Sequence, residues 1–349
     1  MVIITRGFLI LSATFFSLSA QALHTSAGIP SGTTLRTVSP MVISGKKDVV
    51  VRGVRISNPS GSCILINNGS QNILIENSEI GPCASFGVNV TGSTTIKVQN
   101  SYIHDTKNVA VYTYNVTGLH VYNNRIERYK KGVLSVVSRQ AVVRHNKFLN
   151  GNPWQYSLSG NAVQFDKVTG AGNRVSCNMV ENRPGESHVK GTEVINMYKS
   201  SGVSRDRIQI MSNKIKGGGS STTGGINPSD YGSSYVLIKD NILVDSGAVG
   251  TGLWGGHHNQ IMNNLIYARS QPFTWSGITI WNQKQTSGMK CYGHTVGGNQ
   301  VNWTGKHGKK NPYYNNGTCG PIAGLNTNIW NAPIGPSIWY LGRPACTRL

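Results

Sequence analysis

Apolar and polar residues alternate along most of the chain in short units of the form apolar-x-apolar-x-Asn-x-x-apolar. The clearest copies are residues 73–80, 96–103 and 119–126, which place Asn77, Asn100 and Asn123 at the asparagine position. Looser copies place other residues there, namely Gly53, His145, Cys177, Ser212, Asp240, Asn263 and Gly298. Successive positions lie 24, 23, 23, 22, 32, 35, 28, 23 and 35 residues apart. A period near 23 with alternating apolar residues predicts a solenoid of strands.

A second short strand is predicted in most repeats, usually after a glycine. The segments concerned are 87–90, 132–135, 161–165, 194–198, 224–228, 252–254 and 277–281. Two or three strands in each coil predict an all-β fold, a right-handed parallel β-helix of about ten coils. The Asn positions fit this fold, because asparagine tolerates left-handed bends and can hydrogen-bond along a stack of turns. We therefore assign these asparagines to turns and not to chemistry.

Three successive coils are longer than the basic repeat. The coils that end at Cys177, Ser212 and Asp240 exceed 23 residues by about 9, 12 and 5. Insertions in a solenoid emerge as loops, usually on one face, and that face often binds ligands. We expect these loops to wall a groove. The segment from about residue 299, rich in Trp, Asn and Gly, is predicted to cap the C-terminal end.

Strand alternation predicts which side chains face the groove. If Val163, Ile195 and Ile226 face the core, then Gln164, Asn196 and Asn227 form an outward polar column on successive coils. Tyr198 and Asp166 are expected beside it. Basic residues are frequent in the same region, and they are Lys167, Arg174, Arg183, His188, Lys190, Lys199, Arg205 and Arg207.

The charge balance indicates an anionic ligand. The chain has 33 Lys+Arg against 13 Asp+Glu, a formal net charge of +20, although only 13% of its residues are charged. Nucleic acid is one candidate, because cations dominate phosphate binding, but no nucleic-acid-binding module is apparent. An acidic polysaccharide is therefore preferred as partner, with neutral glycans and surface adhesion as alternatives.

The first residues are predicted to be a signal peptide. Arg6 precedes an apolar run from Gly7 to about Ala20, and Ala20-Gln21-Ala22 has the small-x-small form of a cleavage site. Cleavage after Ala22 leaves residues 23–349 as a single β-helix domain, secreted or periplasmic, with no membrane span. An uncleaved anchor is the alternative, and the mature protein is expected to be a monomer.

Cysteine usage agrees with export. Six cysteines form an even set that allows 15 disulfide pairings, among which the sequence does not choose. Because no Cys-x-x-Cys is present, zinc and redox chemistry are not expected.

Segments between residues 145 and 335 resemble a family. Residues 161–167 (NAVQFDK) and 193–202 (EVINMYKSSG) resemble secreted bacterial β-helix proteins related to an alginate (poly-mannuronate) lyase family, and residues 215–220, 241–245 and 280–283 are also similar. The resemblance implies a right-handed parallel β-helix that cleaves an acidic polysaccharide by β-elimination with Tyr and Lys side chains. The chain departs from the family at 217–221 (GGGSS), 227–233 (NPSDYGS) and 190–193 (KGTE).

Elimination requires a neutralised uronate carboxylate, a base for the C5 proton and an acid for the leaving oxygen. Lys199 and Tyr198 are the predicted proton-transfer pair, with Tyr156 and Lys190 as further catalytic candidates. Substrate binding is assigned to Gln164, Asp166, Lys167, His188, Asn196, Arg205, Arg207 and Asn227. Tyr198 could instead stack on a sugar ring, and Lys199 could be a solvated cation.

Other chemistries have weaker signals. Hydrolysis by paired carboxyl groups would need Asp166 with Glu193 or Glu186, and a calcium site would need Asp166 and Glu193. His257 and His258 are adjacent, so they face opposite ways on a strand. We expect no metal and no cofactor.

Two classes of function therefore follow. The first is a polysaccharide lyase acting on a uronate polymer, supported by Tyr198 and Lys199 among the loop insertions. The second is a non-catalytic polysaccharide-binding protein or adhesin, supported by the departures from the family pattern. A glycoside hydrolase or a C5-epimerase on the same fold is a further alternative, because epimerisation begins with the same proton abstraction.

Overall fold

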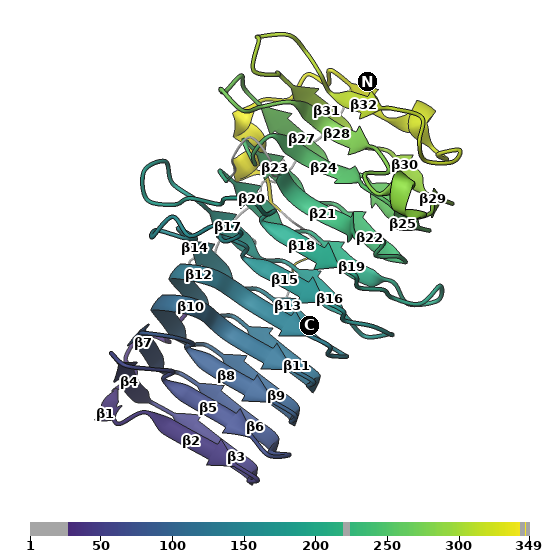
Figure 1. The fold of residues 1–349 in the computed structure, drawn as a ribbon. Coiled ribbons are helices and arrows are strands. Elements are labelled where there is room, and N and C mark those ends of the chain that lie inside the picture. The colour runs from purple at the N-terminus through teal and green to yellow at the C-terminus, as the bar shows by residue number, and fades with distance from the viewer. Residues whose placement is uncertain (1–26, 219–223, 343–345, 347–349) are drawn as a thin grey trace, which may run out of the picture.

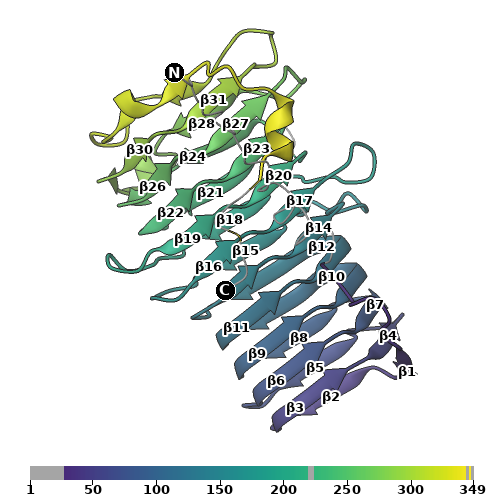
Figure 2. The same ribbon diagram turned by 180° about the vertical axis from the view of Figure 1, so that it is seen from behind.

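The computed structural model describes residues 27–218, 224–342 and 346, and they form a right-handed parallel β-helix (Figures 1 and 2). The all-β architecture predicted from the repeat is thereby confirmed. The expected signal peptide, residues 1–22, lies outside the described residues. Within the described part of the chain, no helix has the length and apolar character needed to cross a membrane.

Each coil contributes strands to three faces, and every ladder between coils is parallel. On the first face the strands stack in the order β1 (Arg36–Val38), β4 (Val54–Asn58), β7 (Glu79–Cys83), β10 (Tyr102–Tyr114), β12 (Arg125–Val136), β14 (Lys147–Leu149), β17 (Met179–Glu181), β20 (Lys214–Lys216), β23 (Ile242–Val244), β27 (Leu265–Ala268), β31 (Gln300–Trp303) and β33 (Ile329–Trp330).

The second face carries the predicted second strands of the repeats. Its order is β2 (Met41–Ser44), β5 (Ile64–Asn67), β8 (Val88–Thr91), β10, β12, β15 (Val163–Asp166), β18 (Ile195–Tyr198), β21 (Gly224–Asp230), β24 (Val249–Leu253), β28 (Ser276–Ile280) and β32 (Tyr313–Asn315). Because β10 and β12 are long strands that continue round the corner, they belong to both the first and the second face.

The third face is a sheet of ten strands built from the repeat units themselves. Its order is β3 (Lys47–Arg52), β6 (Gln71–Glu76), β9 (Thr94–Gln99), β11 (Thr117–Tyr122), β13 (Val142–Arg144), β16 (Arg174–Ser176), β19 (Ile208–Met211), β22 (Val236–Lys239), β26 (Gln260–Met262) and β30 (Thr295–Gly297). Outside the three faces lie the pair β25 (Gly256–His257) and β29 (Cys291–Tyr292) and the short 3-10 helices η1 (Gln285–Ser287), η2 (Leu325–Thr327) and η3 (Pro336–Tyr340).

The core consists of columns of aliphatic side chains that run through the coils. On the third face one column joins Val51, Ile75, Val98, Val121, Val143, Val175, Ile210, Ile238, Ile261 and Val296, all of which are buried. Polar residues alternate with these core residues, which is the pattern of strands with one buried side.

The asparagine positions of the repeat form left-handed bends, as predicted. All ten positions from Gly53 to Gly298 have φ between 49° and 67°. The hydrogen-bonded stack, however, lies one residue later than the repeat position. The stack is formed by the buried amides of Asn124, Asn146, Asn178, Asn213, Asn241, Asn264 and Asn299 and ends at the half-buried Asn328, each amide donating to the next at 2.8–3.0 Å. Among the repeat positions themselves, Asn123 Nδ2 donates a hydrogen bond to Asn100 Oδ1 at 2.8 Å.

The three predicted insertions occupy the same corner of successive coils. They connect β14 to β15 (residues 150–162), β17 to β18 (182–194) and β20 to β21 (217–223), the last described only as far as Gly218. Figure 1 shows the loops after β14 and β17 projecting from one side of the solenoid. They therefore border the second face where β15, β18 and β21 lie.

Disulfides fix the two ends of the solenoid. Cys63 pairs with Cys83 on neighbouring early coils, and Cys291 pairs with Cys319 near the other end. The C-terminal segment adds β31–β33 to the stack, then packs η3 over β23 through Ile338 and Trp339. Beyond η3, Cys346 returns to Cys177, 169 residues earlier in the chain. Three disulfides are typical of an extracytoplasmic protein.

The first coil is the outer end of the stack. Among the described residues, β1, β2 and β3 pair only with β4, β5 and β6. Val42 is 69% exposed and Val50 54% exposed beside a hollow rimmed by Arg36 and Arg52. The described residues at this end therefore expose outward-facing apolar side chains, while the inward-facing Ile43 and Val51 are each only 6% exposed.

Candidate functional site

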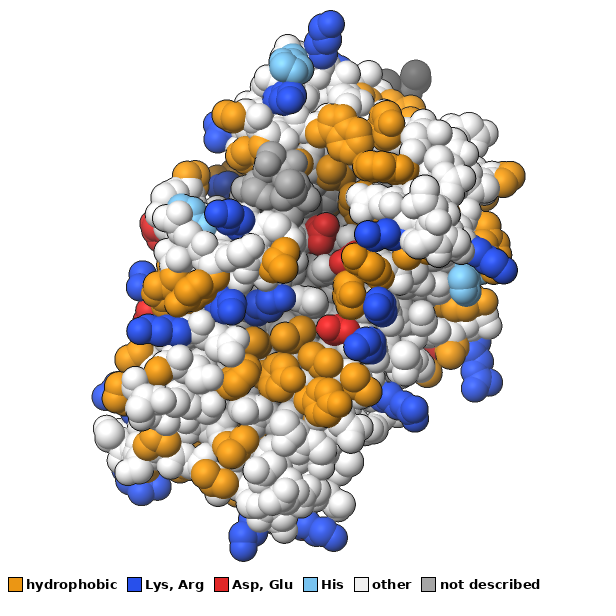
Figure 3. Space-filling view, viewed as in Figure 1, with side chains coloured by type: hydrophobic (Ala, Val, Ile, Leu, Met, Phe, Trp, Pro, Cys, Tyr) orange, Lys and Arg blue, Asp and Glu red, His pale blue; other side chains and the backbone are white. Residues whose placement is uncertain are grey.

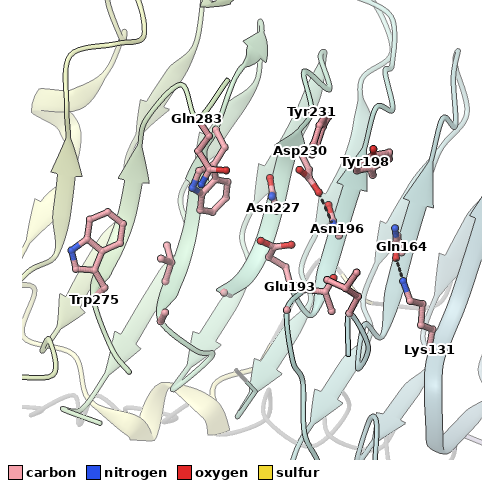
Figure 4. A pocket seen from close by; sticks show the side chains of 17 residues that line it. Lys131, Gln164, Glu193, Asn196, Tyr198, Asn227, Asp230, Tyr231, Trp275 and Gln283 are labelled. Atoms are coloured by element: carbon pink, nitrogen blue, oxygen red, sulfur yellow. Dashed lines mark hydrogen bonds between the residues drawn. The ribbon is translucent and has the colours of Figure 1, made fainter. Parts of the chain in front are cut away.

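A groove of about 560 Å³ lies on the second face, beside the inserted loops. Figure 3 shows it as a hollow bordered by acidic and basic side chains, and Figure 4 shows its lining. The lining residues are Lys131, Leu158, Gln164, Gly191, Thr192, Glu193, Asn196, Tyr198, Gly224, Asn227, Asp230, Tyr231, Ala248, Val249, Trp254, Trp275 and Gln283.

The predicted polar column forms the floor of this groove. Gln164 on β15 is in register with Asn196 on β18, which is in register with Asn227 on β21. Asn196 Nδ2 donates to Asp230 Oδ2 at 3.0 Å, and Lys131 Nζ donates to Gln164 Oε1 at 2.5 Å (Figure 4). The amides are thus held in place by partners on neighbouring coils.

Two carboxyl groups lie at the centre of the groove. Burial and, to a smaller extent, the nearby Asp230 raise the pKa of Glu193 to about 7, although hydrogen bonds with the backbone and with the Asn227 side chain oppose the shift. Burial also raises the pKa of Asp230, against the hydrogen bond from Asn196 and the charge of Lys284. The groove can therefore offer a protonated carboxyl group as a hydrogen-bond donor near neutral pH.

Lys131 is a half-buried lysine at one end of the groove. It lies in β12, next to the corner that β12 shares between two faces. Burial lowers the pKa of Lys131 to about 8, and the charge of Lys130 lowers it too, while Asp166 opposes the shift. A lysine with such a pKa can exchange a proton close to neutral pH.

Aromatic rings and lysines form one wall. The rings of Tyr198 and Tyr231 lie 5.0 Å apart, measured between centroids. Lys199 Nζ lies 5.3 Å from the Tyr198 centroid and 5.4 Å from that of Tyr231, and Lys284 Nζ lies 4.8 Å from the latter. Lys199 has a φ of 48°, so its side chain leaves the strand at a bend next to Tyr198.

Four of the predicted site residues thus share the groove: Gln164, Asn196, Tyr198 and Asn227. Lys199 touches its wall through the two tyrosine rings. Asp166 lies in register with Tyr198, and Lys167 follows it as an exposed residue at a bend.

The remaining predicted residues lie elsewhere. Tyr156 is 38% exposed on the first inserted loop, where Lys130 Nζ lies 5.2 Å from its ring centroid. His188 and Lys190 belong to the second loop, and Lys190 pairs with Ser159 through the backbone. Arg205 is exposed, and the Arg207 guanidinium donates to the His258 carbonyl beside the third face.

Sequence reasoning missed Lys131, Asp230 and Tyr231, and it weighed Glu193 only for hydrolysis or calcium. Glu193 directly precedes the predicted strand 194–198, near the end of the second inserted loop. This position could have identified Glu193 as a groove residue. The groove was expected to be polar and basic, with Asp166 beside it, and the structure adds the carboxyl groups of Glu193 and Asp230 to its lining.

One further cluster combines Cys291, His294 and Cys319, whose ligand atoms lie within 4.8 Å of one another. Both sulfurs are joined in a disulfide. Nδ1 of the buried His294 accepts a hydrogen bond from the Asn259 backbone at 3.1 Å, which leaves its proton on Nε2, facing the Cys291 sulfur at 3.4 Å. This arrangement suits a structural disulfide and not a metal ion.

The fold and groove define a right-handed β-helix protein. A family model described as a right-handed β-helix region matches residues 41–204. A search of curated proteins gave no match.

Solved structures include distant neighbours. An alginate lyase, AlyF-OU02, aligns at 12% identity and a TM-score of 0.34. The alignment covers 81% of this chain but only 61% of the length of that enzyme. The mannuronan C-5 epimerase AlgE6 A-module from Azotobacter vinelandii aligns at 12% identity and a TM-score of 0.30, over 91% of this chain and 93% of that one.

Proposed function

We propose that the protein is a polysaccharide lyase that cleaves a uronate-containing polymer, with poly-mannuronate as the first candidate, by β-elimination. The observation that carries the proposal is the combination, in one groove, of Tyr198, a lysine with a lowered pKa and a carboxyl group that is protonated near neutral pH. The sequence resemblance to alginate-lyase-related proteins supports the same reaction.

The substrate carboxylate would bind at the amide column. Protonated Glu193, together with Asn196 and Asn227, offers hydrogen-bond donors to a uronate carboxylate, and partial neutralisation of that carboxylate acidifies the C5 proton. An approaching anion also stabilises the protonated form of Glu193. The acidic centre of the groove is therefore compatible with an acidic polymer.

Proton transfer is assigned to the lysines and Tyr198. A neutral Lys131 removes the C5 proton, with Lys199 as the alternative base. The electron pair of that C–H bond forms the C4=C5 double bond, and the C4–O4 bond breaks. The departing O4 takes a proton from Tyr198. Positioned acid–base groups of this kind contribute roughly 10²–10⁴-fold in rate.

A second candidate is glycoside hydrolysis, which Glu193 and Asp230 favour because both are carboxyl groups with raised pKa values in one groove. A C5-epimerase would use the lyase groups without breaking the chain. The test incubates purified protein with poly-mannuronate and other uronate polymers. Lyase activity gives shorter chains and ultraviolet absorbance from the double bond.

The other outcomes contradict the proposal. New reducing ends without that absorbance would identify hydrolysis, and altered uronate stereochemistry at constant chain length would identify epimerisation. Binding with none of these changes would identify a polysaccharide-binding protein.

A further inference from the structure

The groove floor continues as an apolar strip toward the N-terminal coils. In register with Gln164, the column passes through Leu134, Tyr112, Asn89 and Leu65 on β12, β10, β8 and β5. The neighbouring outward column, which contains Tyr198 and Asp166, continues through Val136, Tyr114 and Thr91. Both columns change from polar to largely apolar between β15 and β12.

We define the apolar strip as Leu65, Phe86, Tyr112, Tyr114, Leu134 and Val136. The rings of Phe86 and Tyr112 lie 5.0 Å apart between centroids, and Tyr114 is 47% exposed. Figure 3 shows a continuous apolar patch over this part of the second face, directly below the charged side chains of the groove. A patch of this kind on a soluble protein marks a binding surface.

We propose that the apolar strip is a distal binding surface for the polysaccharide chain, so that the polymer runs along the solenoid axis and is engaged in its interior. The inference rests on the proposed function for the identity of the ligand. The occupant follows from continuity, because all residues of the strip except Phe86 belong to the two outward columns that continue into the floor and the wall of the groove.

The chemistry of the strip suits sugar rings. A pyranose presents a face of C–H groups that packs against aromatic and aliphatic side chains, while its hydroxyl groups remain solvated at the edges. The six residues carry no charge, so the strip adds contact area and leaves recognition of the uronate carboxylate to the groove. From Gln164 to Leu65 the column crosses four coil steps, which is about 19 Å.

This arrangement predicts action on chain interiors. A polymer that covers the strip extends well beyond the groove on one side, so the enzyme should cut internally and release intermediate-length products. Short substrates that fill only the groove should bind without any contribution from the strip.

The experiment compares the affinities of long poly-mannuronate and its trisaccharide for wild type, Tyr112→Ala, Tyr114→Ala and the control Tyr340→Ala. Tyr340 is 70% exposed on η3, away from the second face. We expect the Kd of the polymer to rise about tenfold in Tyr112→Ala and measurably in Tyr114→Ala, with the trisaccharide unaffected and the control unchanged. Thermal unfolding midpoints identify any variant that fails to fold. If Tyr112→Ala does not fold, the polymer affinity of Tyr114→Ala, which changes an exposed side chain, decides the result.

Several outcomes would overturn the inference: unchanged polymer affinity, equal losses for polymer and trisaccharide, or a concentration-dependent dimer that Tyr114→Ala abolishes, which would mean that a second copy covers the strip. Binding is measured separately from cleavage. Tight polymer binding that depends on the strip but yields no unsaturated product would therefore contradict the lyase and leave the strip supported.

Discussion

At the scale of single residues, the choice between Lys131 and Lys199 as base can be tested directly. We expect Lys131→Met to lower turnover by about a hundredfold and to remove a rise in rate as the pH passes through about 8, where the neutral amine forms. Lys199→Met serves as the matched variant, since both changes remove one ammonium group from the groove region.

If Lys199 is the base, the large loss appears in Lys199→Met, while Lys131→Met keeps the pH dependence of the wild type. Lys199→Ala should change the free energy of unfolding by no more than about 1 kcal/mol, because the side chain is exposed. Tyr198→Phe should reduce turnover if its hydroxyl donates the proton, but should mainly raise KM if the ring only stacks on the sugar.

Glu193 should make ligand binding depend on pH. Its pKa in the folded protein, about 7, lies above the ordinary glutamate value of 4.5. Polymer affinity should therefore fall as the pH rises through 7 and the carboxyl group ionises, and Glu193→Gln should remove this loss, as binding titrations at several pH values would show.

The same shift links folding to pH. Because the folded-state pKa is raised, ionisation favours the unfolded state, so the free energy of unfolding should decrease between about pH 4.5 and 7. A Glu193→Gln protein with the same decrease would show that another group is responsible.

At the scale of structural elements, the asparagine stack should contribute strongly to stability. The Asn213 side chain accepts hydrogen bonds from the backbone and side chain of Asn178 and donates to Val175 O and Asn241 Oδ1. Asn213→Ala leaves these buried groups unsatisfied, so we expect a loss of about 2–4 kcal/mol in denaturant unfolding. The control Asn316→Ala, which removes an exposed amide bonded to Thr318, should cost less than about 1 kcal/mol. Equal effects in both variants would contradict a stabilising role for the stack.

The elements show why the fold was readable from the sequence and part of the site was not. Every repeat position has a positive φ, and six of the ten are Asn or Gly, which made the turns recognisable in the sequence. Alternation placed Gln164, Asn196 and Asn227 correctly. The register then shifts between Asn196 and Tyr198, so that Tyr198 lies opposite Asp230, where strict alternation predicts Ser229.

A similar shift precedes Lys131, which pairs with Val109 beyond an irregularity in β10. Alternation alone could not assign Asp230 or Lys131 to the groove, because each bulge changes which face the following residues occupy. The burial that shifts the pKa values of Lys131 and Glu193 also arises from neighbouring coils that are distant in sequence.

At the scale of the whole molecule, the net charge of +20 should govern encounter with an anionic polymer. Affinity should fall as salt rises, because ion release and unscreened attraction both favour the complex at low ionic strength. Affinity chromatography at increasing salt measures this effect. Retention that does not change from low to physiological salt would instead favour a neutral glycan, since hydrogen bonding and stacking depend little on screening.

The exposed outer edge of the first coil has a consequence for self-association. Among the described residues this edge pairs with no further strand, and Val42 and Val50 are exposed there with Arg36, Lys47 and Arg52 around them. Two such ends repel each other through these cations at low salt, a common protection of sheet edges. Screening should remove the repulsion, so we expect end-to-end dimers in sedimentation experiments as salt rises, and Val50→Lys should suppress them. The same charge that attracts a polyanion to the groove would then also keep the solenoids from joining into longer ones.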